Sequence, residues 1–374
     1  MKSKERLLAA IRREPVDRVP ANIYYYMQAF YDAHLRDEAP EDAFEAQLQS
    51  QLRFGFDPLI GLGGGRGLPW KDSDPGRWES RAQSVGAPDE HCVRYEIDTP
   101  AGRLTTEWGE PPGQSGWDIE PLLAEGQEES VAALAYLPRP DVDVEAIDHD
   151  WAQMGDRGLG WLSVYGIWQQ ACYIRGMETM AADPYLRPDF TRRFLEYLTD
   201  YLEAQVEALC ATQVETVYIN ESYVGMGISP KVFNEFIAPY DRRLVDAAKR
   251  HGKLVLYHDC GKMDALVEGF ADLGIDYLEP ITPRNASGDV EPADVKRRIG
   301  DRVCLRGGFN HDLLTRGTPD EVRAEVRHCL ENLAPCGGYM LCPSSSVTPD
   351  TRWENLLAYA EAAAEFCGDY GSAS

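Results

Sequence analysis

Four side chains that suit a soft metal ion stand at the ends of predicted strands in the second half of the chain. His258 and Cys260 are separated by one residue, and Glu279 and Cys342 follow at later strand ends. In an extended segment, positions i and i+2 point to the same side, so His258 and Cys260 can face one ion. Imidazole and thiolate are donors that zinc prefers. The pattern predicts a catalytic zinc site, with Glu279 or a substrate atom in the fourth position.

The remaining cysteines have a simpler interpretation. The chain holds nine cysteines, an odd number, and its N-terminus shows no export signal. We therefore expect reduced thiols and a cytoplasmic protein. Cys336 is the nearest rival of Cys342, but it precedes its strand and so belongs to the opposite end of a barrel. A lone buried cysteine is usually a small core residue, and we assign that role to Cys92, Cys172, Cys210, Cys304, Cys329, Cys336 and Cys367.

Repeated strand–helix units must position these residues. From about residue 158 onward, short apolar runs alternate with amphipathic stretches. This alternation is typical of parallel strands covered by helices. It predicts an α/β protein with a (β/α)8 TIM barrel, because a doubly wound sheet would require a nucleotide fingerprint near its first strand. The predicted strands are 17–26, 160–166, 215–222, 253–260, 275–280, 302–308 and 338–343, and the predicted helices are 3–13, 40–56, 189–211, 229–252, 263–274 and 318–334.

The first half of the chain has a different character between residues 57 and 140. The segment 92–108 alternates apolar and polar residues on both sides of a TPAG turn, which is typical of a β-hairpin. The glycine-rich segment 61–67 lacks the Lys-Ser/Thr that follows a phosphate-binding loop. We predict one barrel domain over residues 1–374, with a β-rich insertion or cap at 57–140.

Composition and charge exclude several classes of partner. The 374 residues include 37 Lys and Arg against 62 Asp and Glu, a net charge of −25. Nucleic acids and anionic membrane surfaces are bound by clustered Lys and Arg. No apolar run approaches the roughly 18 residues that span a bilayer. We expect neither nucleic acid nor a membrane as partner.

Other strand ends supply candidate pocket residues, because barrel enzymes act at the carboxyl ends of their strands. Asn220 and Glu221 end one strand, and we expect them to hydrogen-bond to the substrate or exchange protons with it. An unpaired carboxylate at a buried strand end is costly, which favours a catalytic role for Glu221. The candidate substrate-binding residues are Tyr24, Tyr26, Met27, Tyr165, Trp168, Asn310 and His311, with core packing as the alternative for each aromatic.

Two long segments resemble a known family. HDCGKMDALVEGFADLGIDYLEP at 258–280 and GGYMLCPSSSVTPDTRWENL at 337–356 resemble the uroporphyrinogen decarboxylase-like superfamily, and the chain looks like its zinc- and corrinoid-dependent methyltransferase branch. That branch carries H-x-C and a distant Cys, which match His258, Cys260 and Cys342. In the related cobalamin-independent methionine synthase barrel, zinc is bound through His, Cys, Glu and Cys, and the matching glutamate here is Glu279. A base or a helix-capping carboxylate that does not ligate the metal remains the alternative for Glu279.

The resemblance implies an activity, a cofactor and a partner. It implies methyl transfer, with Zn²⁺, between a small methylated substrate or thiol acceptor and a corrinoid (cobalamin), and it is compatible with demethylation and with a homodimer. No D-x-H-x-x-G corrinoid motif occurs, so a separate corrinoid-binding protein is expected. The tyrosines at 24–26 hint at a flat substrate such as a methoxylated aromatic.

A decarboxylating lyase acting on a carboxylated substrate is the alternative function. Uroporphyrinogen decarboxylases hold the carboxylates of their substrate with an arginine-rich motif, which would fall near residues 20–35. This chain has no Arg between residues 19 and 35. Binding a substrate with eight carboxylates without those cations would be electrostatically poor.

Overall fold

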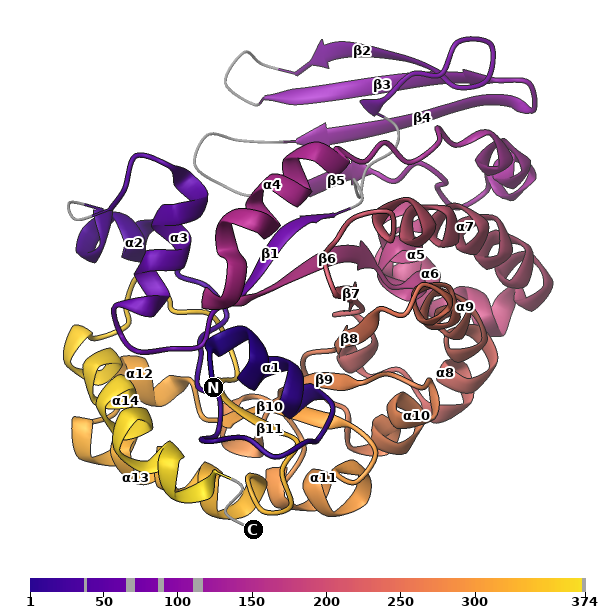
Figure 1. Cartoon of the computed structure of the whole chain (residues 1–374). Coiled ribbons are helices and arrows are strands. Elements are labelled where there is room, and N and C mark those ends of the chain that lie inside the picture. The colour runs from indigo at the N-terminus through magenta and orange to yellow at the C-terminus, as the bar shows by residue number, and fades with distance from the viewer. Residues whose placement is uncertain (37–38, 65–70, 87–90, 110–116, 372–374) are drawn as a thin grey trace.

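A curled parallel sheet forms the centre of the protein, and helices surround it (Figure 1). The computed structural model describes residues 1–36, 39–64, 71–86, 91–109 and 117–371. The sheet has seven strands in the order β1-β6-β7-β8-β9-β10-β11. Their bounds are Leu59–Gly64 (β1), Leu159–Tyr165 (β6), Thr216–Asn220 (β7), Leu254–His258 (β8), Tyr277–Ile281 (β9), Cys304–Phe309 (β10) and Tyr339–Pro343 (β11).

The predicted first strand at 17–26 does not form a regular strand. Its backbone is instead held at separate points: Ala21 forms an isolated parallel bridge with Leu341 of β11, and the Asp57 N–H donates to the Ala21 carbonyl. Pro20 has no N–H for a ladder, and the Ala21 N–H donates to the side chain of Asp57. The predicted α/β class with a curled parallel sheet is confirmed, but among the described residues the sheet has seven strands and not eight, with this segment between β11 and β1.

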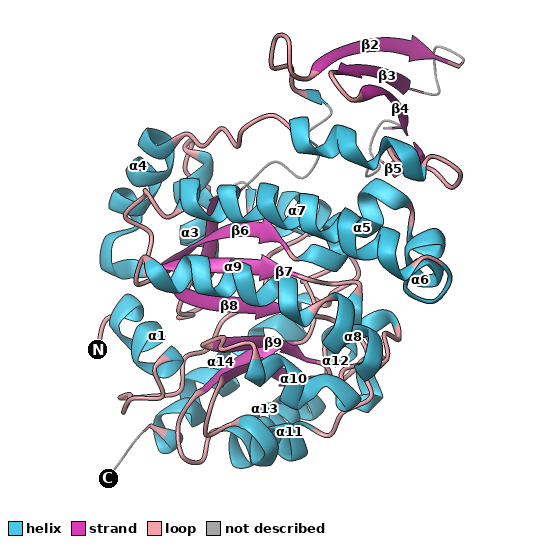
Figure 2. Cartoon of the chain, turned by 90° about the vertical axis from the view of Figure 1, so that its right-hand side faces the viewer, coloured by secondary structure: helices cyan, strands magenta, loops and turns pink. Residues whose placement is uncertain are grey.

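Helices pack on the outer face of the sheet. α7 (Pro188–Leu209) and α9 (Ala238–Arg250) lie side by side over β6–β8 (Figure 2). The helix predicted at 229–252 is in fact two helices, because Pro239 lacks an N–H and clashes with a preceding turn. α8 (Pro230–Phe236) ends before it and α9 begins. The start predicted at Thr318 is confirmed: its side chain and Glu321 form a capping box.

The other helices follow the order of the chain. The α-helices are α1 (Ser3–Ile11), α2 (Gln28–His34), α3 (Ala43–Leu52), α4 (Val144–Met154), α5 (Ile167–Arg175), α6 (Met177–Leu186), α10 (Val267–Asp272), α11 (Pro292–Ile299), α12 (Asp312–Arg316), α13 (Pro319–Leu333) and α14 (Trp353–Phe366). The 3-10 helices are η3 (Glu128–Tyr136), η4 (Gly155–Arg157), η5 (Val224–Met226), η6 (Asp264–Leu266), η7 (Arg284–Ala286) and η8 (Cys367–Tyr370). Among the described helices, none is both long and apolar enough to cross a bilayer.

The first helix closes the end of the curled sheet at which the strands begin. Leu7, Ala10 and Ile11 of α1 belong to one buried cluster with a residue from each of the seven strands. This apolar plug fills the interior of the curled sheet at that end, so the sheet is open to a cavity at the opposite end, where the strands finish. The strand residues of the cluster are Leu59, Leu159, Tyr218, Leu256, Tyr277, Cys304 and Met340.

A separate antiparallel sheet stands beside the curled sheet (Figure 1). It consists of β2 (Glu79–Val85), β3 (Cys92–Thr99), β4 (Gly102–Gly109) and β5 (Trp117–Glu120). The predicted hairpin is confirmed, because β3 and β4 pair in register through Thr99 and Gly102. Ile97 and Leu104 belong to the main buried cluster, so this sheet packs onto the rest of the molecule.

The glycine-rich segment contains a strand that the sequence analysis did not expect. Its glycines are needed for close packing: a Cβ on Gly61 would lie 2.8 Å from the Trp161 ring, and one on Gly63 would lie 2.9 Å from Ile147 of α4. β1 therefore pairs with β6 of the curled sheet although it lies within 57–140. Residues 65–67 of the segment lie outside the described residues.

Candidate active site

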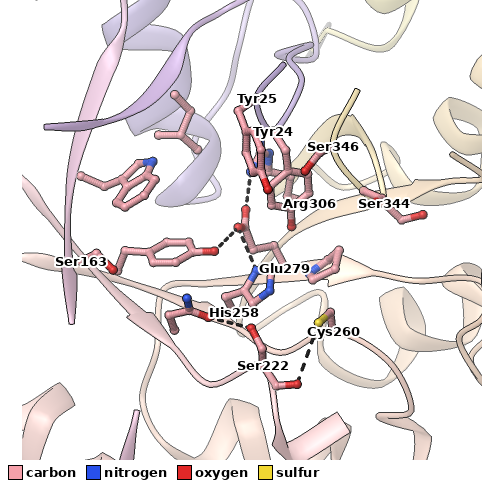
Figure 3. A pocket seen from close by; sticks show the side chains of 16 residues that line it. Tyr24, Tyr25, Ser163, Ser222, His258, Cys260, Glu279, Arg306, Ser344 and Ser346 are labelled. Atoms are coloured by element: carbon pink, nitrogen blue, oxygen red, sulfur yellow. Dashed lines mark hydrogen bonds and ion pairs between the residues drawn. The ribbon is translucent and has the colours of Figure 1, made fainter. Parts of the chain in front are cut away.

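A cavity of about 390 Å³ opens where the strands of the curled sheet finish. Figure 3 shows its side chains from close by. Aromatic side chains form part of its wall, and Trp161 stacks on Tyr218 with ring centroids 4.4 Å apart. The side chains that line the cavity include Tyr24, Trp161, Tyr218, Asn220, Ser222, His258, Cys260, Glu279, Arg306 and Ser344.

Glu279 is the centre of a hydrogen-bond network on this wall. Its Oε1 accepts from the Tyr218 hydroxyl at 2.9 Å and lies 3.3 Å from Nδ1 of His258. Its Oε2 accepts from the Tyr277 hydroxyl and from Nη1 of Arg306. Burial raises the pKa of Glu279, but Arg306 and His258 outweigh burial and bring that pKa to about 2. The carboxylate is therefore ionised and accepts hydrogen bonds only.

Arg306 is a site residue that the sequence analysis missed. It lies on β10, its side chain is 3% exposed, and it forms an ion pair with Glu279. Nε donates to Asn22 Oδ1 at 2.8 Å, and Nη2 donates to the Ile23 carbonyl at 2.8 Å. The guanidinium also lies 4.3 Å from the centroid of the Tyr24 ring. A charged residue within an apolar strand could have revealed it, because a buried cation requires a partner.

His258 and Cys260 stand together, as their spacing predicted. His258 is the register partner of Glu279 across β8 and β9. Burial lowers the pKa of His258, but hydrogen bonds to Cys260 and Glu279 raise it to about 9. Burial raises the pKa of the Cys260 thiol, yet the hydrogen bond and charge of His258 hold that pKa below its ordinary value. Cys260 Sγ also lies 3.9 Å from the Ser222 carbonyl oxygen.

Cys342, the fourth predicted ligand, does not line this cavity. It is the last residue but one of β11, at the same end of the sheet, but it is fully buried. Burial raises the pKa of Cys342 to about 12, although the charge of Arg306 beside it lowers that pKa. Over the described ranges of the chain, no three His, Cys, Asp or Glu side chains form a group that could hold a metal ion. The donor types suit zinc, but the predicted cage is not assembled, and zinc binding stays a prediction.

The two predicted catalytic residues lie in different places: one lines the cavity and the other is buried outside it. Asn220 lines the cavity, and its Oδ1 accepts from the Ser222 hydroxyl at 2.8 Å. Glu221 is fully buried beside the first turn of α5, where its oxygens accept from the backbone N–H groups of Trp168 at 2.5 Å and Gln169 at 2.9 Å. Burial and the nearby Asp241 raise the pKa of Glu221. Two backbone donors thus satisfy the carboxylate that seemed unpaired in the sequence.

Of the predicted substrate-binding residues, only Tyr24 lines the cavity. His311 reaches its wall indirectly, because its Nδ1 lies 3.0 Å from the hydroxyl of Ser344. The others lie elsewhere: Tyr26 donates to the Ser50 carbonyl, Met27 is 41% exposed, Tyr165 packs on Tyr173, Trp168 is in the core, and the amide of Asn310 donates to the Asn285 carbonyl.

A polar cavity at the carboxyl ends of parallel strands is the arrangement in which barrel enzymes bind their substrates. The sequence profile of the family described as Uroporphyrinogen decarboxylase (URO-D) matches residues 162–366, more than half of the chain. The protein therefore belongs to the uroporphyrinogen decarboxylase family.

Individual relatives are distant. A uroporphyrinogen decarboxylase of Coxiella burnetii (strain Dugway 5J108-111) is 23% identical over 382 residues, covering 97% of this chain and 95% of the relative. One of Pseudoalteromonas translucida (strain TAC 125) is 29% identical over 183 residues, and the match covers 48% of this chain and about half the length of that relative, 48%. Among solved structures, a methyltransferase from Methanosarcina mazei has a TM-score of 0.66 at 17% identity, covering 98% of this chain and 99% of that one. At this identity the likeness shows a shared fold.

Proposed function

We propose that this protein is a zinc-dependent methyltransferase of the uroporphyrinogen decarboxylase family, which moves a methyl group between a small methylated substrate or thiol acceptor and a separate corrinoid protein. The observation that carries the proposal is that His258 and Cys260, two residues apart, both line one cavity of small-molecule size. An imidazole and a thiol with a lowered pKa are the donors of an exchangeable zinc site. The fold shared with a methyltransferase from Methanosarcina mazei supports it.

Each wall of the cavity has a part in this activity. His258 and Cys260 would hold the zinc, with Cys342 and Glu279 as the further predicted donors. When bound, zinc supplies Lewis acidity that either lowers the pKa of a bound thiol or polarises the heteroatom of a methyl donor. The aromatic side chains of Tyr24 and Trp161, which line the cavity, would offer apolar contact to a flat substrate.

The same cavity is poorly suited to a polycarboxylated substrate. Within the described part of the chain, Arg306 is the one Lys or Arg side chain that lines it. Its N–H groups already donate to Asn22, Ile23 and Glu279. A buried arginine that is neutralised in this way attracts a carboxylate weakly. This arrangement favours methyl transfer over the decarboxylation for which the family is named.

The test is a single-turnover assay with free cob(I)alamin, which stands in for the corrinoid of the partner protein. Zinc-loaded protein is mixed with methoxylated phenols, methanol, methylamines or methyl thioethers, and the Co(I) absorption is followed for conversion to methyl–Co(III). We expect conversion with one substrate class, together with about one zinc per chain by elemental analysis. Cys260→Ser should lose both, whereas Cys336→Ser, which changes an exposed thiol, should keep both.

Two results would contradict the proposal. One is full zinc content and full conversion in Cys260→Ser, which would remove the zinc pair from the reaction. The other is release of carbon dioxide from uroporphyrinogen by chelator-treated protein without any methyl transfer, which would establish the lyase instead.

A further inference from the structure

We propose that a second cavity, between α2 and α3, binds an uncharged aromatic molecule that carries an N–H donor, such as an aromatic amide. Side chains from both helices line this cavity, and its volume is about 480 Å³. Cavities of this size hold small molecules. The inference concerns a site apart from the candidate active site, and it stands whether or not the protein moves methyl groups.

The first argument is that three tyrosines, Tyr25, Tyr26 and Tyr31, line the cavity. Tyr26 is held in place on both sides: its ring stacks on Phe30 with centroids 5.8 Å apart, and its hydroxyl donates to the Ser50 carbonyl at 3.0 Å. Tyr25 is 52% exposed, so much of its ring is available for contact. Aromatic side chains bind flat apolar groups well, which favours an aromatic ligand.

The second argument is that two polar groups of the cavity have no partner. Gln51 is 1% exposed, and its Oε1 accepts no hydrogen bond from any described residue. The buried hydroxyl of Tyr31 also has no partner in the described part of the chain. Buried polar atoms are usually paired, and both residues line the cavity. Because an amide oxygen only accepts whereas a hydroxyl also donates, a ligand with an N–H donor and a carbonyl acceptor suits the two groups.

The third argument is that the cavity offers little attraction to an anion. Over the ranges that the structure describes, Arg36 is the one charged side chain in its lining. That side chain is 65% exposed and pairs with Asp32 at 3.1 Å. Asp32 also accepts from Gln28 Nε2 at 2.7 Å. An exposed arginine that already has a counter-charge contributes little to binding a carboxylate, so the lining favours a neutral ligand.

The cavity adjoins the candidate active site at Tyr25. This side chain lines both cavities, and Figure 3 shows it on the wall of the candidate active site. A small aromatic probe therefore has two places to bind. The experiment must report on each cavity separately.

The first experiment titrates the unaltered, ¹⁵N-labelled full chain with benzamide and follows its NMR resonances. The side-chain amide of Gln51, assigned by its absence in Gln51→Leu, reports on this cavity, and the indole N–H of Trp161 reports on the candidate active site. We expect a saturable shift at Gln51. Benzoate, which is charged, and N,N-dimethylbenzamide, which has no N–H, should each bind about 10-fold more weakly. If Gln51 shows no saturable shift, or if only Trp161 shifts, the proposal is overturned.

The second experiment compares the benzamide affinities of variants by calorimetry. Gln51→Leu removes the acceptor and Tyr31→Phe removes the hydroxyl, and each should weaken binding about 10-fold. The matched control is Gln49→Leu on the same helix, because Gln49 donates to Glu45 at 2.7 Å and does not line this cavity. Its affinity for benzamide should be unchanged. If folded Gln51→Leu and Tyr31→Phe both bind benzamide as tightly as the unaltered protein, the proposal is overturned.

The outcomes keep this inference apart from the proposed function. Tyr31→Phe removes a single oxygen atom, so it tests the cavity even where Gln51→Leu fails to fold. A protein that binds benzamide here but transfers no methyl group refutes only the proposed function. A protein that transfers methyl groups but binds no benzamide refutes only the second site.

Discussion

At the scale of single residues, the site depends on charges that are buried in opposed pairs. Arg306 and Glu279 are both almost fully buried and form one ion pair. Removing one partner of such a pair leaves the other charge without compensation. Replacing both partners removes the attraction between the two charges but leaves no uncompensated charge in the interior.

We therefore expect Arg306→Met to lower the free energy of unfolding by about 3–5 kcal/mol. The double variant Arg306→Met/Glu279→Gln should lose less than the sum of the two single variants, because neither charge is then left unpaired. Denaturant titration followed by circular dichroism measures all three. Arg157→Met is the control, since its pair with Glu45 is partly exposed and contributes about 0–1 kcal/mol. Strictly additive losses would show that the two residues do not interact.

Asp241 gives a prediction about pH. It accepts from the Ile167 N–H at 2.9 Å and the Tyr257 hydroxyl at 2.7 Å, and burial raises its pKa from 3.8 to about 6. A raised carboxyl pKa favours the protonated form in the folded state. The resulting stabilisation is complete below the ordinary pKa and is lost as the pH rises through about 6, at roughly 1.4 kcal/mol per pKa unit.

The measurement is the difference in unfolding free energy between the unaltered protein and Asp241→Asn. An asparagine keeps the shape and can accept from Ile167 while donating to Tyr257. The unfolding free energy of the unaltered protein minus that of the variant should fall between about pH 4 and pH 6. Above that range this difference should stay constant. A difference that does not change with pH, or that rises with pH, would show that burial does not raise the pKa of Asp241.

Sequence reasoning succeeded where a residue's spacing alone decides its neighbours, and failed where distant segments decide them. Positions i and i+2 of an extended segment face the same side, so the proximity of His258 and Cys260 was predictable, although β8 itself ends at His258. The partners of Arg306 come from Asn22 and Ile23, nearly 300 residues earlier in the chain. Likewise, nothing near Glu221 in the sequence indicates that α5 begins against it.

At the scale of elements, α5 begins where Gly166 packs closely against Glu221, with no room for an additional side-chain atom. Gly166 precedes the helix, and Glu221 accepts from the backbone N–H groups of Trp168 and Gln169 in its first turn. A Cβ on Gly166 would lie 2.4 Å from Glu221 Oε2 and 2.8 Å from Glu221 Cβ. Because Gly166 has an ordinary extended conformation, with φ of −70°, an added methyl group acts through crowding and not through backbone strain.

We expect Gly166→Ala to lower the free energy of unfolding by about 1–3 kcal/mol, the usual range for overpacking. It should also displace Glu221 from the end of α5, visible as faster hydrogen exchange at Trp168 and Gln169. Gly368→Ala is the matched control, since a Cβ there meets nothing within 4 Å. Equal stability of the two variants would mean that the helix shifts at no cost and that Glu221 does not fix its position.

The type of an element was predictable where one pattern of apolar residues dominated, but the residues at which the element begins and ends were not. The six strands predicted from residue 160 onward alternate with amphipathic helices, and all six belong to the curled sheet. β1 escaped prediction because its glycines lack the side chains that mark a strand, although they are what lets Trp161 and α4 approach. The segment 17–26 was predicted as a strand from its composition. However, Pro20 has no N–H to donate, and the Ala21 N–H donates to the side chain of Asp57 and not to a neighbouring strand.

At the scale of the whole molecule, the segment 17–26 joins the last strand of the curled sheet, β11, to the residues that precede the first, β1. Asp57 stands just before β1 and is fully buried. Its carboxylate pairs with Arg6 of α1 at 2.6 Å and with Arg18 at 2.9 Å, and it accepts from the Ala21 N–H. One side chain thus joins the plug helix, the segment beside β11 and the first strand of the sheet.

The closure gives the last prediction. Asp57→Asn should lower the free energy of unfolding by about 3–5 kcal/mol, because two arginines lose a buried counter-charge. The change should be local first, with faster hydrogen exchange at the Asn22 and Leu341 N–H groups that bond across the closure.

Asp17→Asn is the control. Asp17 also pairs with Arg6, but its side chain is 41% exposed, so the substitution should lower the free energy of unfolding by only about 0–1 kcal/mol. Since Arg306 also donates to Asn22, loosening of this segment should reach the cavity and, if the proposed zinc site exists, weaken its affinity for zinc in Asp57→Asn but not in Asp17→Asn. Unchanged exchange at Leu341 in Asp57→Asn would show that the plug helix and the cavity are held independently.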